Sequence, residues 1–171
     1  MLLFKDKINY KMPQGNGFQP HLDAPAYDHI GRIEHLTANI AIDAATPENG
    51  CLEVVPGSHR MDVELADGGC ISDAWVRDHE WVKVELDASD VLLFGSHLAH
   101  RSGPNKTDHR RASLYATFHG RSDGEDLRAK YYAPRILSSD EADRRCNSRR
   151  INQASSMDSW KRRKPSALYD N

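Results

Sequence analysis

Residues 91–119 have the sequence VLLFGSHLAHRSGPNKTDHRRASLYATFH. The stretch opens on a continuous apolar run at 91–94, which is consistent with a strand buried on both faces. It closes on residues 111–119, which we expect to form another strand. The Gly-Pro-Asn tripeptide at 103–105 indicates a turn between them, so we expect a hairpin.

Other short strands are expected before this stretch. Residues 2–10 alternate mostly between apolar and polar side chains, the period-two pattern of a strand. Turn signals such as the Asn-Gly dipeptide separate the remaining candidates, which are residues 32–42, 51–55 and 81–86. Several short strands with frequent turns are typical of a sandwich or barrel, so we predict a mainly β fold.

Helix signals are weak before Ser138, where a Ser-Ser-Asp-Glu run provides an N-cap followed by acidic residues. The chain beyond is polar and basic. We therefore predict a core domain over residues 1–137 and a short helix with a polar basic tail over 138–171. We interpret the run KRRK at 161–164 as a solvated charged segment. The alternatives are a nuclear localisation signal and an anion-binding patch.

Length and charge limit the classes of function. A chain of 171 residues is long enough for one domain. Its net charge of −2 does not indicate a nucleic-acid partner. The sequence shows no signal peptide, membrane span or C-terminal peroxisomal signal. We therefore expect a cytoplasmic protein that acts on a small molecule, and the oligomeric state stays open.

A metal site is indicated by His21-x-Asp23. Residues i and i+2 of a strand point to the same side, so both side chains can reach one ion. Such a pair is common by chance, and a third ligand is needed. His100, which follows the buried strand at 91–94 after a short loop, is a candidate for that place, with His97 as the rival. Two histidines and one carboxylate, without cysteine, suit an Fe(II) oxygenase better than a structural zinc site.

Such an oxygenase also needs a cation to bind the far carboxylate of its co-substrate. Arg111 is the candidate for this cation. Arg111 follows His100 after the predicted turn, so both side chains can reach the same cavity. A planar guanidinium matches a carboxylate through two parallel hydrogen bonds. The neighbouring Arg110 should point to the other face of the strand as a surface charge.

Two further segments carry a resemblance to a known family. The run GCLEVVPGSHR at 50–60 is similar to a G-x-L-x-x-x-P-G-S-H motif, and residues 100–111 are similar to an H-x-S-x-x-N…R motif. Together with His21-x-Asp23, these segments resemble the phytanoyl-CoA dioxygenase family in order and spacing. Three ordered motifs are specific in combination, whereas each alone is not.

The resemblance implies a double-stranded β-helix, which is a jelly-roll or cupin-like fold. It implies that the catalytic metal is Fe(II), held by His21, Asp23 and His100. Family members also carry further residues ahead of the metal motif. Because this chain begins inside the strand before that motif, part of the N-terminal scaffold is expected to be missing.

The co-substrate site that the resemblance implies has Arg111 on the C5 carboxylate of 2-oxoglutarate. Ser102 assists Arg111, and Asn39 lines the pocket. The implied reaction is hydroxylation of a small organic substrate by O2, with release of succinate and CO2. The alternative, motivated by the short N-terminus, is a non-catalytic relative that binds metal and ligand without turnover.

Overall fold

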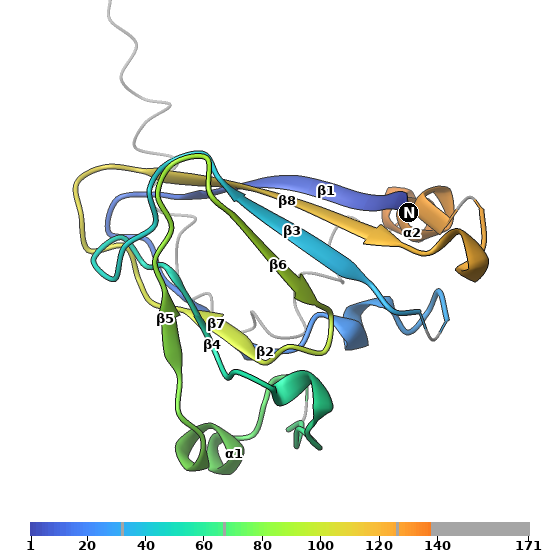
Figure 1. Cartoon of the computed structure of the whole chain (residues 1–171), viewed down its shortest axis with the longest axis horizontal. Helices are drawn as coiled ribbons and strands as arrows, with labels where there is room; N and C mark the ends of the chain where they lie inside the picture. Colours follow the sequence, from blue (N-terminus) through green and yellow to red (C-terminus); the bar gives the residue numbers. More distant parts are fainter. Residues whose placement is uncertain (32, 67, 126, 138–171) are drawn as a thin grey trace, which may run out of the picture.

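The computed structural model describes residues 1–31, 33–66, 68–125 and 127–137. Most of the regular structure is in two four-stranded antiparallel sheets, which lie one above the other in Figure 1. The prediction of a mainly β fold is therefore confirmed. The helix and tail predicted over 138–171 lie outside the described residues, so the predicted domain boundary stays a prediction.

The first sheet has the strand order β1-β8-β3-β6 and the second has the order β2-β7-β4-β5. The strands of the first sheet are β1 (Leu2–Lys11), β8 (Arg111–His119), β3 (Leu36–Ala41) and β6 (Val91–Gly95). Those of the second are β2 (Phe18–His21), β7 (His100–Ser102), β4 (Leu52–Val54) and β5 (Val82–Val84). The chain passes repeatedly from one sheet to the other, as a double-stranded β-helix requires.

The predicted hairpin between residues 91–94 and 111–119 is wrong. β6 and β8 both pair with β3 rather than with each other, and β7 lies between them in sequence but in the other sheet. The turn at 103–105 carries the chain from the second sheet to the first. His100 and Arg111 therefore approach the space between the sheets from opposite sides, which still allows them to share a cavity.

Strand β1 turns its polar side chains inward. The pairing with β8 shifts register between Leu3 and Lys5, which marks a β-bulge at Phe4. Beyond the bulge, Lys5, Lys7, Asn9 and Lys11 line the cavity between the sheets, with Lys11 buried and Lys7 still exposed, whereas Ile8 is exposed and does not line it. The period-two pattern of the sequence is thus correct, but the face that it presents to the interior is the polar one.

Two helices precede residue 138, and the sequence patterns predict neither. Helix α1 (Asp73–Asp78) begins after Ser72, whose side chain accepts a hydrogen bond from the Trp75 backbone N–H. Helix α2 (Leu127–Leu137) packs against β1 at one end of the sandwich, near the N-terminus in Figure 1. Its Leu127 and Tyr131 are one turn apart and bury against Phe4. The described elements also include three short 3-10 turns, which are Ala24–Tyr27, Ser58–Arg60 and Arg121–Asp123.

Within the described part of the chain, neither helix has the length and apolar character that a membrane span requires. The cytoplasmic location stays a prediction from the sequence.

Candidate active site

The three predicted metal ligands meet between the sheets. His21 ends β2 and His100 begins β7, and the two are register partners in the second sheet. Asp23 follows β2 in a loop that is fixed by its backbone N–H, which donates to the Ser96 carbonyl over 3.0 Å. One ligand atom from each of His21, Asp23 and His100 lies within 4.8 Å of the others. Small side-chain rotations would bring all three to one ion.

Both histidine rings are oriented by the backbone. His21 Nδ1 lies 2.6 Å from the Gln19 carbonyl oxygen, and His100 Nδ1 lies 2.9 Å from the Leu98 carbonyl oxygen. A carbonyl oxygen only accepts, so each Nδ1 carries the proton and donates it. The lone pair of each Nε2 is then left for a metal, which is the usual support for histidine ligands in metal sites.

The local charges favour the protonation states that bind a metal. Burial, together with the electrostatic influence of the nearby His100, lowers the pKa of His21 to about 4. Burial opposes ionisation of Asp23, but the electrostatic influence of the nearby His100 and Lys5 side chains outweighs it and holds the pKa of Asp23 below its ordinary value. At neutral pH the site therefore offers a neutral imidazole at His21 and a carboxylate at Asp23, as metal coordination requires.

The rival ligand His97 lies elsewhere. Its side chain is about half exposed, and its Nδ1 is 3.8 Å from a carboxylate oxygen of Glu34. It does not belong to the metal-ligand group found among the described residues. The geometry therefore favours His100 over His97 as the third ligand.

Arg111 is buried at the start of β8, with 7% of its surface exposed. Its guanidinium donates to Ser113 Oγ over 2.6 Å and to the Gly50 carbonyl oxygen over 3.1 Å. Its Nε has no hydrogen-bond partner among the described residues. Arg110 is exposed and lies over the Tyr10 ring, on the opposite face as predicted.

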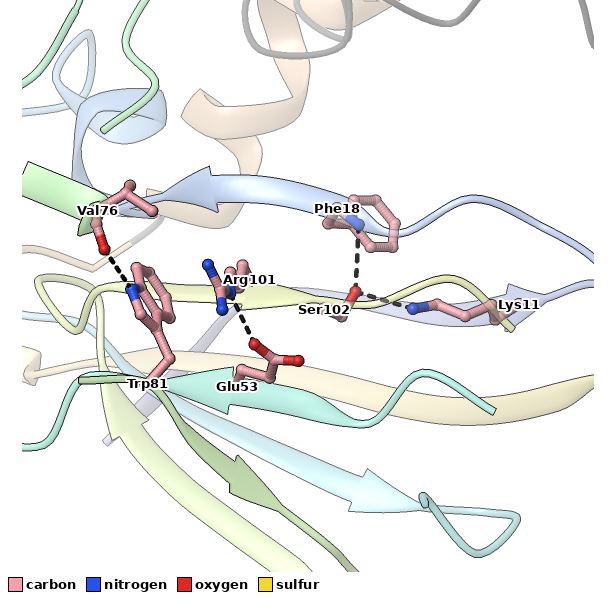
Figure 2. Close-up of polar contacts among 7 residues, drawn as sticks. All are labelled: Lys11, Phe18, Glu53, Val76, Trp81, Arg101 and Ser102. Carbon is pink, nitrogen blue, oxygen red and sulfur yellow. Dashed lines mark hydrogen bonds and ion pairs between the residues drawn. The ribbon is translucent and has the colours of Figure 1, made fainter. Parts of the chain in front are cut away.

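A second buried cation, which the sequence patterns did not indicate, lies beside Arg111. Lys11 is the register partner of Arg111 on β1 and is only 5% exposed. Figure 2 shows its Nζ donating to Ser102 Oγ, over 2.8 Å. The same Nζ donates to the carbonyl oxygens of Gly50 and Gly103 over 3.0 and 2.6 Å. Burial, with a further contribution from Arg111, lowers the pKa of Lys11 to about 8.

Two adjacent cations without a counter-ion are costly in a protein interior. In the described part of the chain, neither Lys11 nor Arg111 forms an ion pair with a carboxylate. A bound anion would offset this cost, and the unpartnered Nε of Arg111 offers it a further donor. The arrangement is therefore suited to a carboxylate ligand.

The metal ligands and the cation pair line one cavity of about 800 Å³. Ser102 also lines it, and its predicted role beside Arg111 stays a prediction. Asn39 does not belong to the lining: it is buried on the inner face of β3, and its Oδ1 has no hydrogen-bond donor among the described residues. Its predicted role in the co-substrate pocket stays a prediction. Several other side chains line the cavity that the sequence patterns do not single out, among them Lys5, Lys7, Thr37, Tyr115 and Thr117.

Arg101, which also lines the cavity, holds strand β7 against β4. Figure 2 shows the Arg101 Nε bonded to a carboxylate oxygen of Glu53, over 2.7 Å. The Arg101 guanidinium also lies 4.3 Å from the centre of the Trp81 ring, and the Trp81 indole N–H donates to the Val76 carbonyl. Arg101 is thus neutralised by Glu53 and fixes β7 against β4, which helps to position His100 and Ser102.

Comparison with known proteins gives the family. Residues 1–113 match the family model "Phytanoyl-CoA dioxygenase (PhyH)". The chain belongs to the phytanoyl-CoA dioxygenase family. It is 47% identical over 139 residues to dioxygenase lolE1 of Epichloe uncinata, which covers 81% of this chain and 54% of that protein. It is 44% identical over 138 residues to methylphosphonate hydroxylase of Gimesia maris, covering 80% of this chain and 52% of that protein.

The family assignment extends to the fold. EctD from S. alaskensis has been solved with 2-oxoglutarate and 5-hydroxyectoine, and also with bound Fe. The 2-oxoglutarate complex superposes on this chain with a TM-score of 0.63 and 27% identity, over 71% of this chain and 45% of that one. The chain spans about half the length of the curated relatives it matches. The double-stranded β-helix of the PhyH family is thereby confirmed.

Proposed function

We propose that the protein is an Fe(II)- and 2-oxoglutarate-dependent dioxygenase that hydroxylates a small organic substrate. The observation that carries this proposal is the shared cavity. A group with the composition of an iron site and a buried pair of cations line it together. The family and the solved neighbours with Fe and 2-oxoglutarate support the same assignment.

Fe(II) fits the donor set. Two imidazoles and one carboxylate are the ligands of non-haem Fe(II) oxygenases, and together they leave positions open for co-substrate and O2. His21, Asp23 and His100 would hold the ion, with both Nδ1 atoms already engaged by carbonyl oxygens. The described metal-ligand group contains no thiolate, which separates it from most structural zinc sites.

2-Oxoglutarate fits the cations on the first sheet, across the cavity from the metal ligands. Arg111 and Lys11 would bind its C5 carboxylate, and the Ser102 hydroxyl, already bonded to Lys11 Nζ, would hold the lysine in place. Such charge-assisted contacts are about twice as strong as neutral hydrogen bonds. Because the metal ligands belong to the second sheet and the cations to the first, the co-substrate would extend from one sheet to the other.

When bound, iron with 2-oxoglutarate and O2 supplies the oxidant for a substrate C–H bond. The balanced outcome is R–H + 2-oxoglutarate + O2 → R–OH + succinate + CO2. The protein's own part is to orient the reactants and to keep water from them. A relative that acts on methylphosphonate supports a small substrate for this chain.

The test is an anaerobic titration of the purified chain with Fe(II) and 2-oxoglutarate, followed by the visible metal-to-ligand charge-transfer band. We expect a band that is absent in His100→Ala and weakened in Arg111→Ala. Succinate release in air, measured over a panel of small substrates, then tests turnover. Folded protein without a band would contradict the proposal. A band without succinate release from any substrate would favour the alternative, a relative that binds metal and ligand without turnover.

A further inference from the structure

Asp23 is the one proposed metal ligand that lies outside the strands. His21 ends β2 and His100 begins β7, so the hydrogen-bond ladder of the second sheet fixes the backbone of both histidines. Asp23 follows β2 as the N-cap of the 3-10 turn Ala24–Tyr27, and its carboxylate lies 4.0 Å from His21 Nε2. The position of this carboxylate therefore depends on what holds the turn.

Backbone hydrogen bonds hold the start of the turn. The N–H groups of Asp23 and Ala24 both donate to the Ser96 carbonyl oxygen over 3.0 Å. The Asp23 carbonyl oxygen accepts from the Ala26 N–H, also over 3.0 Å. Ser96 directly follows β6, and its own N–H donates to the His35 carbonyl oxygen over 3.2 Å. These bonds tie the backbone of Asp23 to the segments that adjoin β6 and β3.

Tyr27 holds the end of the turn within a cluster of rings. It is 1% exposed, and its ring centre lies 4.7 Å from that of His35, 5.3 Å from that of Phe4 and 5.9 Å from that of Tyr131. These three rings come from the segment before β3, from β1 and from α2. The Lys5 ammonium group lies 4.4 Å from the same ring centre. Because packed interiors are dense, the Tyr27 ring can shift only if these neighbours shift with it.

We propose that Tyr27 is a positioning residue for Asp23, and that its buried ring holds the turn so that the carboxylate stays beside His21 and His100. This inference rests on the proposed function, because it concerns the ligands of the same metal site. Pro25 lies between Asp23 and Tyr27, and its ring fixes its φ, which stiffens the connection. Tyr27 thus acts on the metal site through the backbone of the turn, without contact with the metal.

The experiment follows binding of Co(II) to the full chain, without co-substrate, through the visible absorption of the bound ion. Tyr27→Ala should raise the dissociation constant of Co(II) about tenfold or more, as loss of a support behind a metal ligand typically does. Tyr27→Phe keeps the ring and should stay within about threefold of the unmodified chain. Leu127→Ala removes buried apolar volume from the same cluster, but from α2 instead of the turn, and is the matched control. It should also stay within about threefold.

A double-mutant cycle shows whether Tyr27 acts through Asp23. Asp23→Ala alone should weaken Co(II) binding and change the absorption, because one ligand is lost. Adding Tyr27→Ala to Asp23→Ala should cause no further loss, since no carboxylate is left to position. Thermal unfolding checks that each variant is folded, and Tyr27→Leu, which keeps an apolar side chain without the ring, replaces Tyr27→Ala if that variant does not fold.

Three results would overturn the inference while leaving the proposed function intact. They are unchanged Co(II) affinity in folded Tyr27→Ala, an equal loss in Leu127→Ala, and a loss that is the same with and without the Asp23 carboxylate.

Absence of Co(II) binding in the unmodified chain would count against the proposed function instead. Amide hydrogen exchange of the metal-free chain then decides the inference, because the N–H groups of Asp23 and Ala24 are bonded to Ser96. Faster exchange of these two amides in Tyr27→Ala, but not in Tyr27→Phe or Leu127→Ala, supports the positioning role. Unchanged exchange in Tyr27→Ala, or the same acceleration in Leu127→Ala, overturns it.

Discussion

Arg111 and Arg110 are consecutive residues with opposite environments, and they provide a matched pair. Arg111→Ala removes a buried cation, a change that typically costs about 2 kcal/mol or more when the partner is charged. We expect the dissociation constant of 2-oxoglutarate to rise roughly 30-fold or more, measured by the anaerobic band. Arg110→Ala, on the exposed face, should change it less than about twofold. Comparable effects of the two substitutions would contradict the assignment of Arg111.

Lys11 gives the site a pH dependence. Because its pKa is lowered to about 8, Lys11 is charged below that pH and loses its proton above it. Binding of a dianion favours the charged form, so affinity for 2-oxoglutarate should fall as pH rises above about 8, by up to about tenfold per pH unit. Titrations between pH 7 and 9.5 check this.

In Lys11→Met we expect weaker binding at pH 7 and no decline that begins near pH 8. A flat profile in the unmodified chain, or the same decline in the variant, would show that Lys11 does not contact the co-substrate.

The clustering of His21, Asp23 and His100 could be predicted from the sequence, because the spacing of His21 and Asp23 and the motif around His100 each carry local information. Lys11 was not. A lysine at the end of an alternating strand is ordinarily a surface charge, and its burial depends on which face of β1 turns inward. That choice is made by the bulge at Phe4 and by pairing with β8, neither of which is visible in the sequence.

At the scale of elements, the turn at Gly50 joins the two cations. Gly50 has a φ of +76°, and its carbonyl oxygen accepts from both Lys11 and Arg111. A Cβ at this position would lie 2.4 Å from the Gly103 carbonyl oxygen and 2.7 Å from Lys11 Nζ. Gly69 has a similar φ of +82°, but no atom lies within 4 Å of its Cβ position.

Comparing the two glycines therefore separates the cost of a left-handed backbone from the cost of a steric clash at Cβ. Gly69→Ala should lower the free energy of unfolding by about 1–2 kcal/mol, the cost of a left-handed backbone for a residue with a Cβ. Gly50→Ala should lower it further and should also weaken 2-oxoglutarate binding, because Lys11 is displaced. Urea unfolding and the anaerobic titration measure the two effects. Equal stability and equal affinity in the two variants would refute the close approach.

Most of the strands could be predicted from the sequence. β8 matches residues 111–119 at both ends, and β1 extends the predicted strand by one residue. The short strands β2 and β7 were not among the predicted ranges. The sequence pattern did not predict which strands pair with each other. A turn such as the one at 103–105 has the same sequence signals whether it closes a hairpin or carries the chain from one sheet to the other. The two helices were not predicted because their sequences lack clear helix signals. α1 has six residues, and in α2 only Leu127 and Tyr131 are established as buried.

At the scale of the whole molecule, ligands should stabilise the fold by mass action. Fe(II) or 2-oxoglutarate at 100 times its dissociation constant should each add about 2.7 kcal/mol to the free energy of unfolding. We expect the anaerobic melting temperature to rise with metal and to rise again with 2-oxoglutarate, since the second ligand would contact residues of both sheets. Both increments should be absent in His100→Ala if the co-substrate needs the metal. A rise with 2-oxoglutarate alone in that variant would show that the cation pair suffices.

The division of the site between sheets also has a consequence for how the chain acquires its ligands as it folds. His21 and His100 are neighbours within the second sheet, and Asp23 follows β2 directly, so a chain with only that sheet formed would already hold the proposed metal ligands near one another. The carboxylate site needs β1 and β8 docked across from it, and these strands lie at opposite ends of the described chain. During refolding, metal capture should therefore come early and 2-oxoglutarate capture late, and an iron-loaded intermediate should be unable to consume its co-substrate.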